Sequence, residues 1–159
     1  MSDILIKMKN GDEIEAELYP EAAPITVENF LNLIEKRFFD GMVFHRIIEG
    51  FMIQGGGYDE EGNQKPADSI KGEFLSNGFQ NPIKHERGVL SMARTSFPNS
   101  ASSQFFIMHK AAPHLDGEYA AFGKVTKGIE VVDKIASVKT NFVDSPIEPQ
   151  VIESIRVIK

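Results

Sequence analysis

Two runs of the sequence combine amide or guanidinium donors with large apolar side chains. In FHRIIEGFMIQGG, Arg46 is followed by Met52 and Gln54, which stand two residues apart. In SQFFIM, Gln104 and Phe106 are also two apart. Residues two apart share one face of a β-strand, so each strand is expected to carry donors and apolar groups on the same face. Such a surface suits hydrogen bonding to a ligand whose apolar part is held away from water.

Arg46 carries the strongest donor of this set, because a guanidinium stays charged at any ordinary pH. The same alternation predicts that Phe44, Arg46 and Ile48 share a strand face. Taken singly, Met52 or Phe106 is more typical of a core than of a site, and Arg46 of a surface charge. Only their combination favours a binding site.

Other chemistries lack their sequence signals. The glycines at 55–57 match neither the Walker spacing nor the dinucleotide-binding fingerprint, so they are interpreted as a tight backbone feature at a strand end. The acidic residues at 59–61 are interpreted as a solvated turn. The chain has no cysteine, and no serine stands in a GxSxG context. The four histidines show no spacing typical of a zinc site, so we expect neither a metal nor another cofactor. They are His45, His85, His109 and His114.

The elements that would carry these residues are mostly short strands. Alternating apolar residues around Asn10-Gly11 predict a hairpin over about residues 3–19, with a type I′ turn. Behind Pro24, with Thr26 as N-cap, a helix that carries Val27, Phe30, Leu31 and Ile34 is expected to run to about Lys36. Further strands are expected at 42–48, 51–54, 89–93, 104–108, 120–125 and 151–158, and a second short helix carries Ile129, Val132, Ile135 and Ala136.

Many short strands with two helices, and no repeat or linker, favour one all-β-dominated domain over residues 1–159. A closed antiparallel barrel capped by the helices fits this pattern best. The long connections 55–72 and 94–103 are either functional loops or plain surface excursions.

Bulk composition narrows the classes of partner. The chain has 159 residues, 42% of them hydrophobic, which is enough for one core. Its net charge of −6 does not favour binding to nucleic acid or to an anionic membrane, which are themselves negatively charged. No signal peptide or long apolar run is visible, so a cytoplasmic protein is expected. No exposed apolar helix predicts a dimer, so a monomer is expected. Polypeptides or small neutral molecules are the expected partners.

Six motifs in order give the chain a resemblance to the cyclophilins over nearly its whole length, in a short, single-domain, prokaryotic-looking form. They are PITVENFLNLI, FHRIIEGFMIQGG, GEF at 72–74, GVLSMAR, SQFFI and LDGEYAAFGKV. The resemblance implies an eight-stranded antiparallel barrel with two capping helices, a packed interior and a groove on the outer surface. It also implies cofactor-free peptidyl-prolyl cis/trans isomerisation that assists protein folding. The strand alternation agrees that Arg46, Gln54 and Phe106 face together away from the core.

Site roles follow from the resemblance residue by residue. Arg46 matches the arginine that donates to the proline nitrogen of a twisted bond, and Gln54 a residue that orients Arg46 and the substrate carbonyl. Proline-containing polypeptides are the implied substrates. Phe51, Met52, Phe106 and Leu115 match the proline pocket, and Ala93, Arg94 and Gln104 match positions that hold the residues preceding proline.

Three positions depart from the common family pattern. His114 replaces the tryptophan that many members carry before Leu115, so weakened cyclosporin binding is expected; alternatively His114 is a rim residue without a role. Tyr119 stands where histidine is frequent, and Arg94 where asparagine is frequent. Both keep a hydrogen-bonding group near the groove, so altered preference rather than lost catalysis is expected, with the loop 94–97 tuning substrate choice.

Two other functions remain open at this point. One is a cyclophilin-like peptide-binding module that acts as a holdase or scaffold with little isomerase action. The other is a hollow barrel that carries an apolar ligand, which 12 phenylalanines permit but the outward parity of Met52 and Phe106 does not support.

Overall fold

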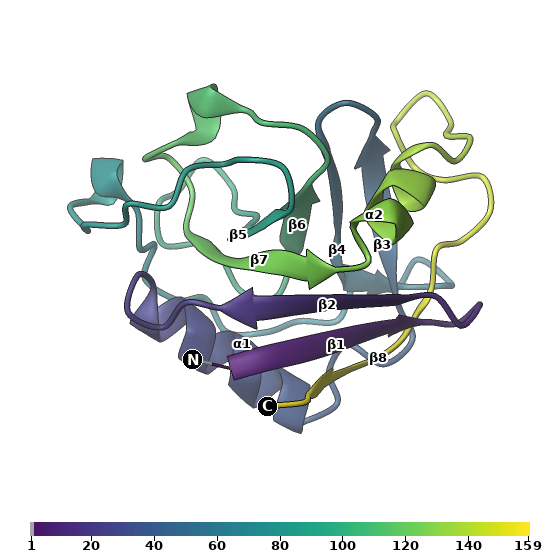
Figure 1. Cartoon of the computed structure of the whole chain (residues 1–159), viewed down its shortest axis with the longest axis horizontal. Helices are drawn as coiled ribbons and strands as arrows, with labels where there is room; N and C mark the ends of the chain where they lie inside the picture. Colours follow the sequence, from purple (N-terminus) through teal and green to yellow (C-terminus); the bar gives the residue numbers. More distant parts are fainter. Residues whose placement is uncertain (1) are drawn as a thin grey trace.

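The computed structural model describes residues 2–159 and shows one nearly closed antiparallel barrel with a helix at each end (Figure 1). Eight strands pair in the order β3-β4-β6-β5-β7-β2-β1-β8. This confirms the predicted fold class. The strands are β1 (Ser2–Met8), β2 (Glu13–Leu18), β3 (Met42–Ile48), β4 (Met52–Asp59), β5 (Val89–Met92), β6 (Phe105–Met108), β7 (Ala121–Lys127) and β8 (Ile152–Val157), and the helices are α1 (Pro24–Glu35) and α2 (Ile129–Ala136).

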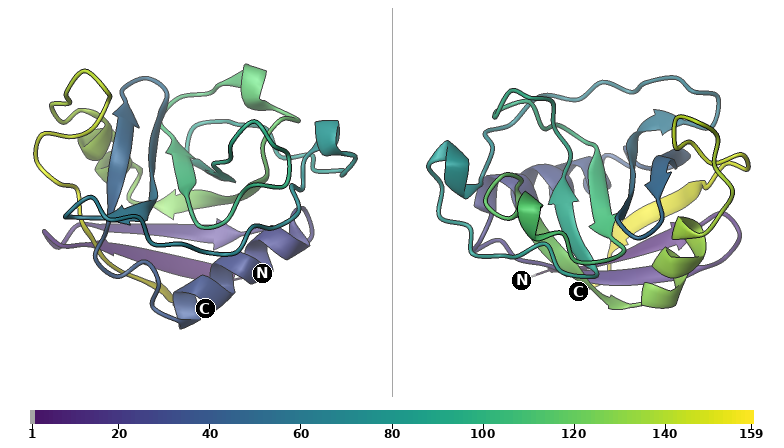
Figure 2. Two further views of the ribbon diagram at one scale, coloured as in Figure 1. Left: turned by 180° about the vertical axis from the view of Figure 1, so that it is seen from behind. Right: turned by 90° about the horizontal axis from the view of Figure 1, so that it is seen from above.

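The outer strands β3 and β8 approach each other where the barrel closes. The Phe44 amide donates to the Gln150 carbonyl at 3.0 Å, and Val43 bridges to Val151. Figure 2 shows the segment between α2 and β8 running past β3 on that side. Neither helix within residues 2–159 has the length and apolar composition needed to cross a bilayer.

The β1–β2 hairpin lies where the sequence predicted it, but its turn differs. The Gly11 amide donates to the Met8 carbonyl, and the Met8 amide to the Asp12 carbonyl. Gly11 has a φ of 96°, whereas Asn10 stays at negative φ. The predicted type I′ turn is therefore wrong, because it needs positive φ at both positions. A three-residue loop of a type I turn and a left-handed glycine replaces it.

Helix α1 begins at Pro24, ahead of its expected start, and Thr26 lies within the first turn instead of capping it. Ala23 occupies the N-cap position and gives no side-chain cap. The fully buried Glu73 carboxylate instead accepts from the Ile25 amide (3.1 Å), the Thr26 amide (2.7 Å) and the Thr26 hydroxyl (2.8 Å). The positive end of the helix dipole favours this anion. A residue 47 positions away thus performs the task predicted for a local side chain.

The barrel interior is filled by aromatic rings. Phe30 packs on Phe39, Phe105 and Phe122 with ring centroids 5.0–5.3 Å apart, and all four are at most 1% exposed. A hollow ligand-carrying barrel does not fit this packed core. A second, smaller apolar cluster lies on the other face of β4 and β6, around Met52 and Phe106.

A β-bulge in β3 separates the two faces. Phe44 pairs with Gly55 and Arg46 with Gln54, so two steps along β3 match one step along β4 and His45 is the extra residue. Phe44 consequently lies in the core while Arg46 is exposed. The prediction that these two residues share a face is wrong, because alternation holds only in an unbroken ladder.

Candidate functional site

A groove of about 330 Å³ lies on the outer face of β3, β4 and β6. Ten of the eleven residues singled out from the sequence line it, which brings together positions 46 to 119 of the chain. Gln104 is the exception, although its side chain is hydrogen-bonded to that of Gln54, which lines the groove. The lining residues are Arg46, Phe51, Met52, Gln54, Ala93, Arg94, Phe106, His114, Leu115 and Tyr119.

The sheet register sets the centre of the groove. Arg46 on β3 lies directly opposite Gln54 on β4, and Gln54 directly opposite Phe106 on β6. Side chains directly opposite each other on one face stand about 5 Å apart at Cβ. Guanidinium, amide and phenyl groups therefore form one row across three strands.

Apolar side chains form the floor of the groove. Met52, Phe106 and Leu115 are between 2% and 7% exposed. The Tyr119 ring stands edge-on to Phe106 at 5.8 Å and 86°, which fixes one wall. The floor can bury a small apolar ring while the groove stays open above it.

The Arg46 guanidinium has no hydrogen-bond or ion-pair partner within residues 2–159, and its side chain is exposed. By contrast, Arg87 and Arg156 form bidentate pairs with Asp133 and Asp40. Arg46 thus lines the groove with donors that have no acceptor among the described residues. This arrangement suits a donor for a bound ligand.

Gln104, the one predicted site residue that does not line the groove, orients Gln54. The Gln54 Nε2 donates to Gln104 Oε1 at 3.1 Å. Gln104 in turn lies against the backbone of Gly57, where an added Cβ would come within 2.5 Å of the Gln104 Cγ. A glycine at 57 therefore leaves the space that this side chain needs.

Arg94 is tied to the protein itself. Its guanidinium lies 4.6 Å from the Tyr119 ring centroid and 4.7 Å from that of Phe74. Nε and Nη2 donate to the Glu118 carbonyl at 3.1 and 2.6 Å, and Nη1 donates to the Thr95 carbonyl at 2.9 Å. Most of its donors are used, so Arg94 joins two walls of the groove and has little capacity left for a ligand.

His114 lies at the exposed rim, where its ring stacks on Phe51 at 5.9 Å with a 30° tilt. The aromatic surface that this rim presents is correspondingly smaller than a tryptophan would give.

Sequence reasoning missed His85, which supports the groove from below. Its ring is 1% exposed and stacks on Phe106 at 6.0 Å and 20°. Its Nε2 lies 2.8 Å from Ser91 Oγ and its Nδ1 3.2 Å from Asp116 Oδ1. Desolvation lowers the pKa of His85 below its ordinary value, so the ring is neutral at neutral pH. Ser91 lies opposite Phe106 in the register, so the place of His85 depends on a strand pairing that no sequence motif indicated.

Comparison with known proteins gives a consistent result. The family model described as cyclophilin type peptidyl-prolyl cis-trans isomerase matches residues 4–157. A peptidyl-prolyl cis-trans isomerase of Acinetobacter baylyi is 47% identical, over 89% of this chain and 76% of its own. Peptidyl-prolyl cis-trans isomerase A of Dickeya dadantii is 43% identical, over 98% of this chain and 84% of its own.

Among solved structures, a cyclophilin of Cryptosporidium parvum crystallised in the presence of the dipeptide Ala-Pro superposes with a TM-score of 0.83. It is 30% identical in sequence, and the match covers 99% of both chains.

Proposed function

The chain belongs to the cyclophilin-type peptidyl-prolyl cis-trans isomerases, and we propose that it performs their reaction with Arg46 as donor and the apolar floor as the seat of the proline ring. The substrates are proline-containing polypeptides. The Cryptosporidium relative crystallised with Ala-Pro supports this class of substrate.

Rotation about an X-Pro bond is slow because the nitrogen lone pair is delocalised into the carbonyl. The barrier is about 18–20 kcal/mol, so uncatalysed exchange takes tens to hundreds of seconds. As the bond twists, conjugation is lost and the nitrogen lone pair becomes a hydrogen-bond acceptor. A donor aimed at this lone pair stabilises the twisted state more than either planar state, and no covalent step or proton transfer is needed.

One observation carries this mechanism: the unpaired Arg46 guanidinium stands in register with Gln54 and Phe106. With the proline ring on Phe106, Met52 and Leu115, water is displaced from the floor, which strengthens the Arg46 interaction. Gln54, held by Gln104, orients the substrate carbonyl.

Recognition of residues preceding proline falls to Ala93 in the groove lining and to Gln104, which lies beside the lining and is bonded to Gln54. Arg94 holds the wall formed by Tyr119. These contacts are mainly to substrate backbone, so recognition is broad. The His114 ring stacked on Phe51 offers cyclosporin a smaller aromatic surface than a tryptophan would, which supports weakened binding of that inhibitor.

Assistance to protein folding is the proposed physiological role, since X-Pro isomerisation limits the folding of many chains. The test is exchange NMR on a short Ala-Pro peptide with catalytic amounts of protein, followed by fluorescence-monitored refolding of a proline-limited substrate. Rapid cis/trans exchange and faster refolding are expected. Peptide binding without faster exchange would instead favour the holdase or scaffold function.

A further inference from the structure

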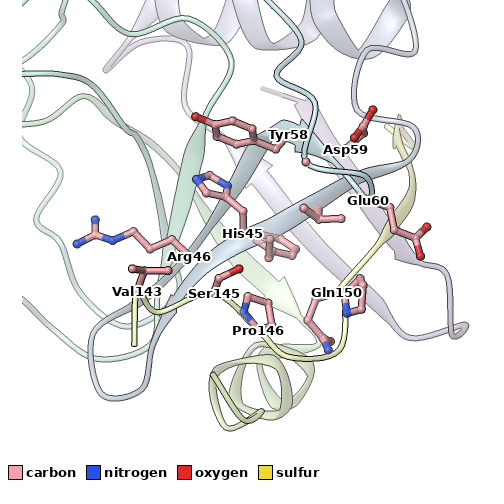
Figure 3. Close-up of a pocket in the computed structure, with 13 residues that line it drawn as sticks. His45, Arg46, Tyr58, Asp59, Glu60, Val143, Ser145, Pro146 and Gln150 are labelled. Carbon is pink, nitrogen blue, oxygen red and sulfur yellow. The ribbon is translucent and has the colours of Figure 1, made fainter. Parts of the chain in front are cut away.

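A second groove, of about 370 Å³, adjoins the first on the other side of Arg46. It lies between the β3–β4 hairpin and the 143–150 segment. Figure 3 shows Arg46 and Val143 at one end and Glu60 at the other, with His45 and Tyr58 facing Ser145 and Pro146. Arg46 lines both grooves, so the two form one continuous surface.

The walls of the second groove are largely uncharged near Arg46. Val43, Val143, Pro146 and Pro149 line it with apolar groups, whereas the side chain of Phe44 lies in the core. The His45 ring packs edge-on against Tyr58 at 4.7 Å. Burial and the Arg46 charge lower the pKa of His45 to about 4, so this wall is neutral at neutral pH.

The segment 139–147 is held in one shape while exposing large apolar side chains. Asn141 Oδ1 accepts from the Val143 and Ser145 amides at 3.0 and 3.1 Å. The Ile47 amide on β3 donates to the Asp144 carbonyl at 2.8 Å, and Asp144 adopts a φ of 62°. Phe142 and Val143 are nevertheless 97% and 59% exposed. An ordered loop that exposes apolar groups beside a binding groove is typical of an interaction surface.

We propose that this second groove binds an apolar side chain of the substrate polypeptide, about three residues after the proline. Treated as spheres, the two adjoining grooves are roughly 9 Å across, a distance that an extended chain covers in about three residues at roughly 3.3 Å each. Ala93 and Gln104, which hold the residues preceding proline under the proposed function, lie towards β5. The second groove lies beyond β3, at the opposite end of the row β3-β4-β6-β5, so it receives the residues that follow.

This inference rests on the proposed function, and the test separates the two. Peptides with one Ala-Pro bond carry leucine or serine at the third position after proline, and a further peptide carries leucine at the third position before it. Exchange NMR gives kcat/KM for each. Wild type is expected to favour leucine over serine after the proline about fivefold or more, as burial of much of a leucine predicts. Leucine before the proline is expected to give no such gain.

Val143→Asp places a charge in the groove and is expected to reduce the leucine-to-serine ratio to about one. Ile147→Asp is the matched control, since Ile147 is 63% exposed on the same loop but does not line the groove. It is expected to keep the wild-type ratio. Equal rates for the leucine and serine peptides, or an equal loss in both variants, would overturn the inference. If folded wild type accelerates the cis/trans exchange of none of these peptides, the proposed function itself is overturned.

Discussion

Replacing Arg46 by alanine removes the guanidinium while leaving the barrel intact. The side chain is exposed and has no partner within residues 2–159, so its loss leaves no buried group unsatisfied. An exposed substitution of this kind changes unfolding free energy by about 0.5 kcal/mol or less. Any large change in rate therefore reports on the reaction rather than on folding.

The expected size of that change follows from the donor's position. Removal of one donor that stabilises a developing lone pair or oxyanion costs about 2.7–4 kcal/mol, which corresponds to 10²- to 10³-fold in rate. The groove above the apolar floor is open, which favours the lower value. We expect Arg46→Ala to reduce kcat/KM about 10²-fold. Arg46→Lys keeps the charge but loses the planar fork, so a smaller loss of about tenfold is expected.

Exchange NMR on an Ala-Pro peptide measures these rates, with circular dichroism and thermal unfolding as checks of the fold. Arg87→Ala is a matched control, because it removes an arginine paired with Asp133 away from the groove. Its kcat/KM is expected to equal that of wild type. A folded Arg46→Ala protein with a near-wild-type rate would refute the donor mechanism.

Four further predictions concern the α1 cap, the His45 wall, the pH profile of the reaction and the Gln104 contact. Glu73→Ala removes three hydrogen bonds at the start of α1 and is expected to lower unfolding free energy in urea by about 3 kcal/mol; an unchanged denaturation midpoint would contradict the cap. His45 binds a proton near pH 6.5 when unfolded but only near pH 4 when folded, so its stabilising contribution is complete above about pH 7 and is lost as pH falls towards 4. Partial exposure reduces that contribution to about 1–2 kcal/mol, and His45→Gln should flatten this part of the pH–stability curve. kcat/KM should stay flat from about pH 6 to 9, and a bell-shaped profile would implicate a histidine in the reaction. Gly57→Ala brings a Cβ within 2.5 Å of Gln104, so it should release Gln54 and raise KM several-fold; unchanged kinetics would remove Gln104 from the orienting role.

The sequence predicted the elements well where local pattern decides them. β3 has the bounds that its apolar run indicated, and α2 carries the expected helical face. β4 runs on to Asp59, five residues beyond its expected end, because Gly55 pairs with both Phe44 and Phe105 and Asp59 pairs with Met42 beyond an irregularity. Glycine there reflects close approach, since a Cβ on Gly55 would lie 2.5 Å from the Val43 carbonyl oxygen.

Features that depend on distant contacts escaped the sequence. The α1 cap comes from Glu73, which no local capping pattern could identify. His85 has no recognisable motif, and its role under Phe106 appears only once β5 and β6 are paired. The second groove requires β3 and the 143–150 segment to meet, and their separation in sequence hides that meeting. Alternation survives in β4 and β6 and identified Met52, Gln54 and Phe106, whereas the family resemblance supplied most of the other groove-lining residues.

The β3 bulge at His45 adds a side chain to one wall of the second groove without changing the faces that its neighbours occupy. Deletion of His45 would make Phe44 and Arg46 adjacent, still opposite Gly55 and Gln54, and adjacent residues of a regular ladder point to opposite faces. Such a deletion would therefore keep Phe44 in the core and Arg46 on the outer face, while removing the ring that packs against Tyr58. For protein engineers, the bulge is a position where the second groove can be altered separately from the donor.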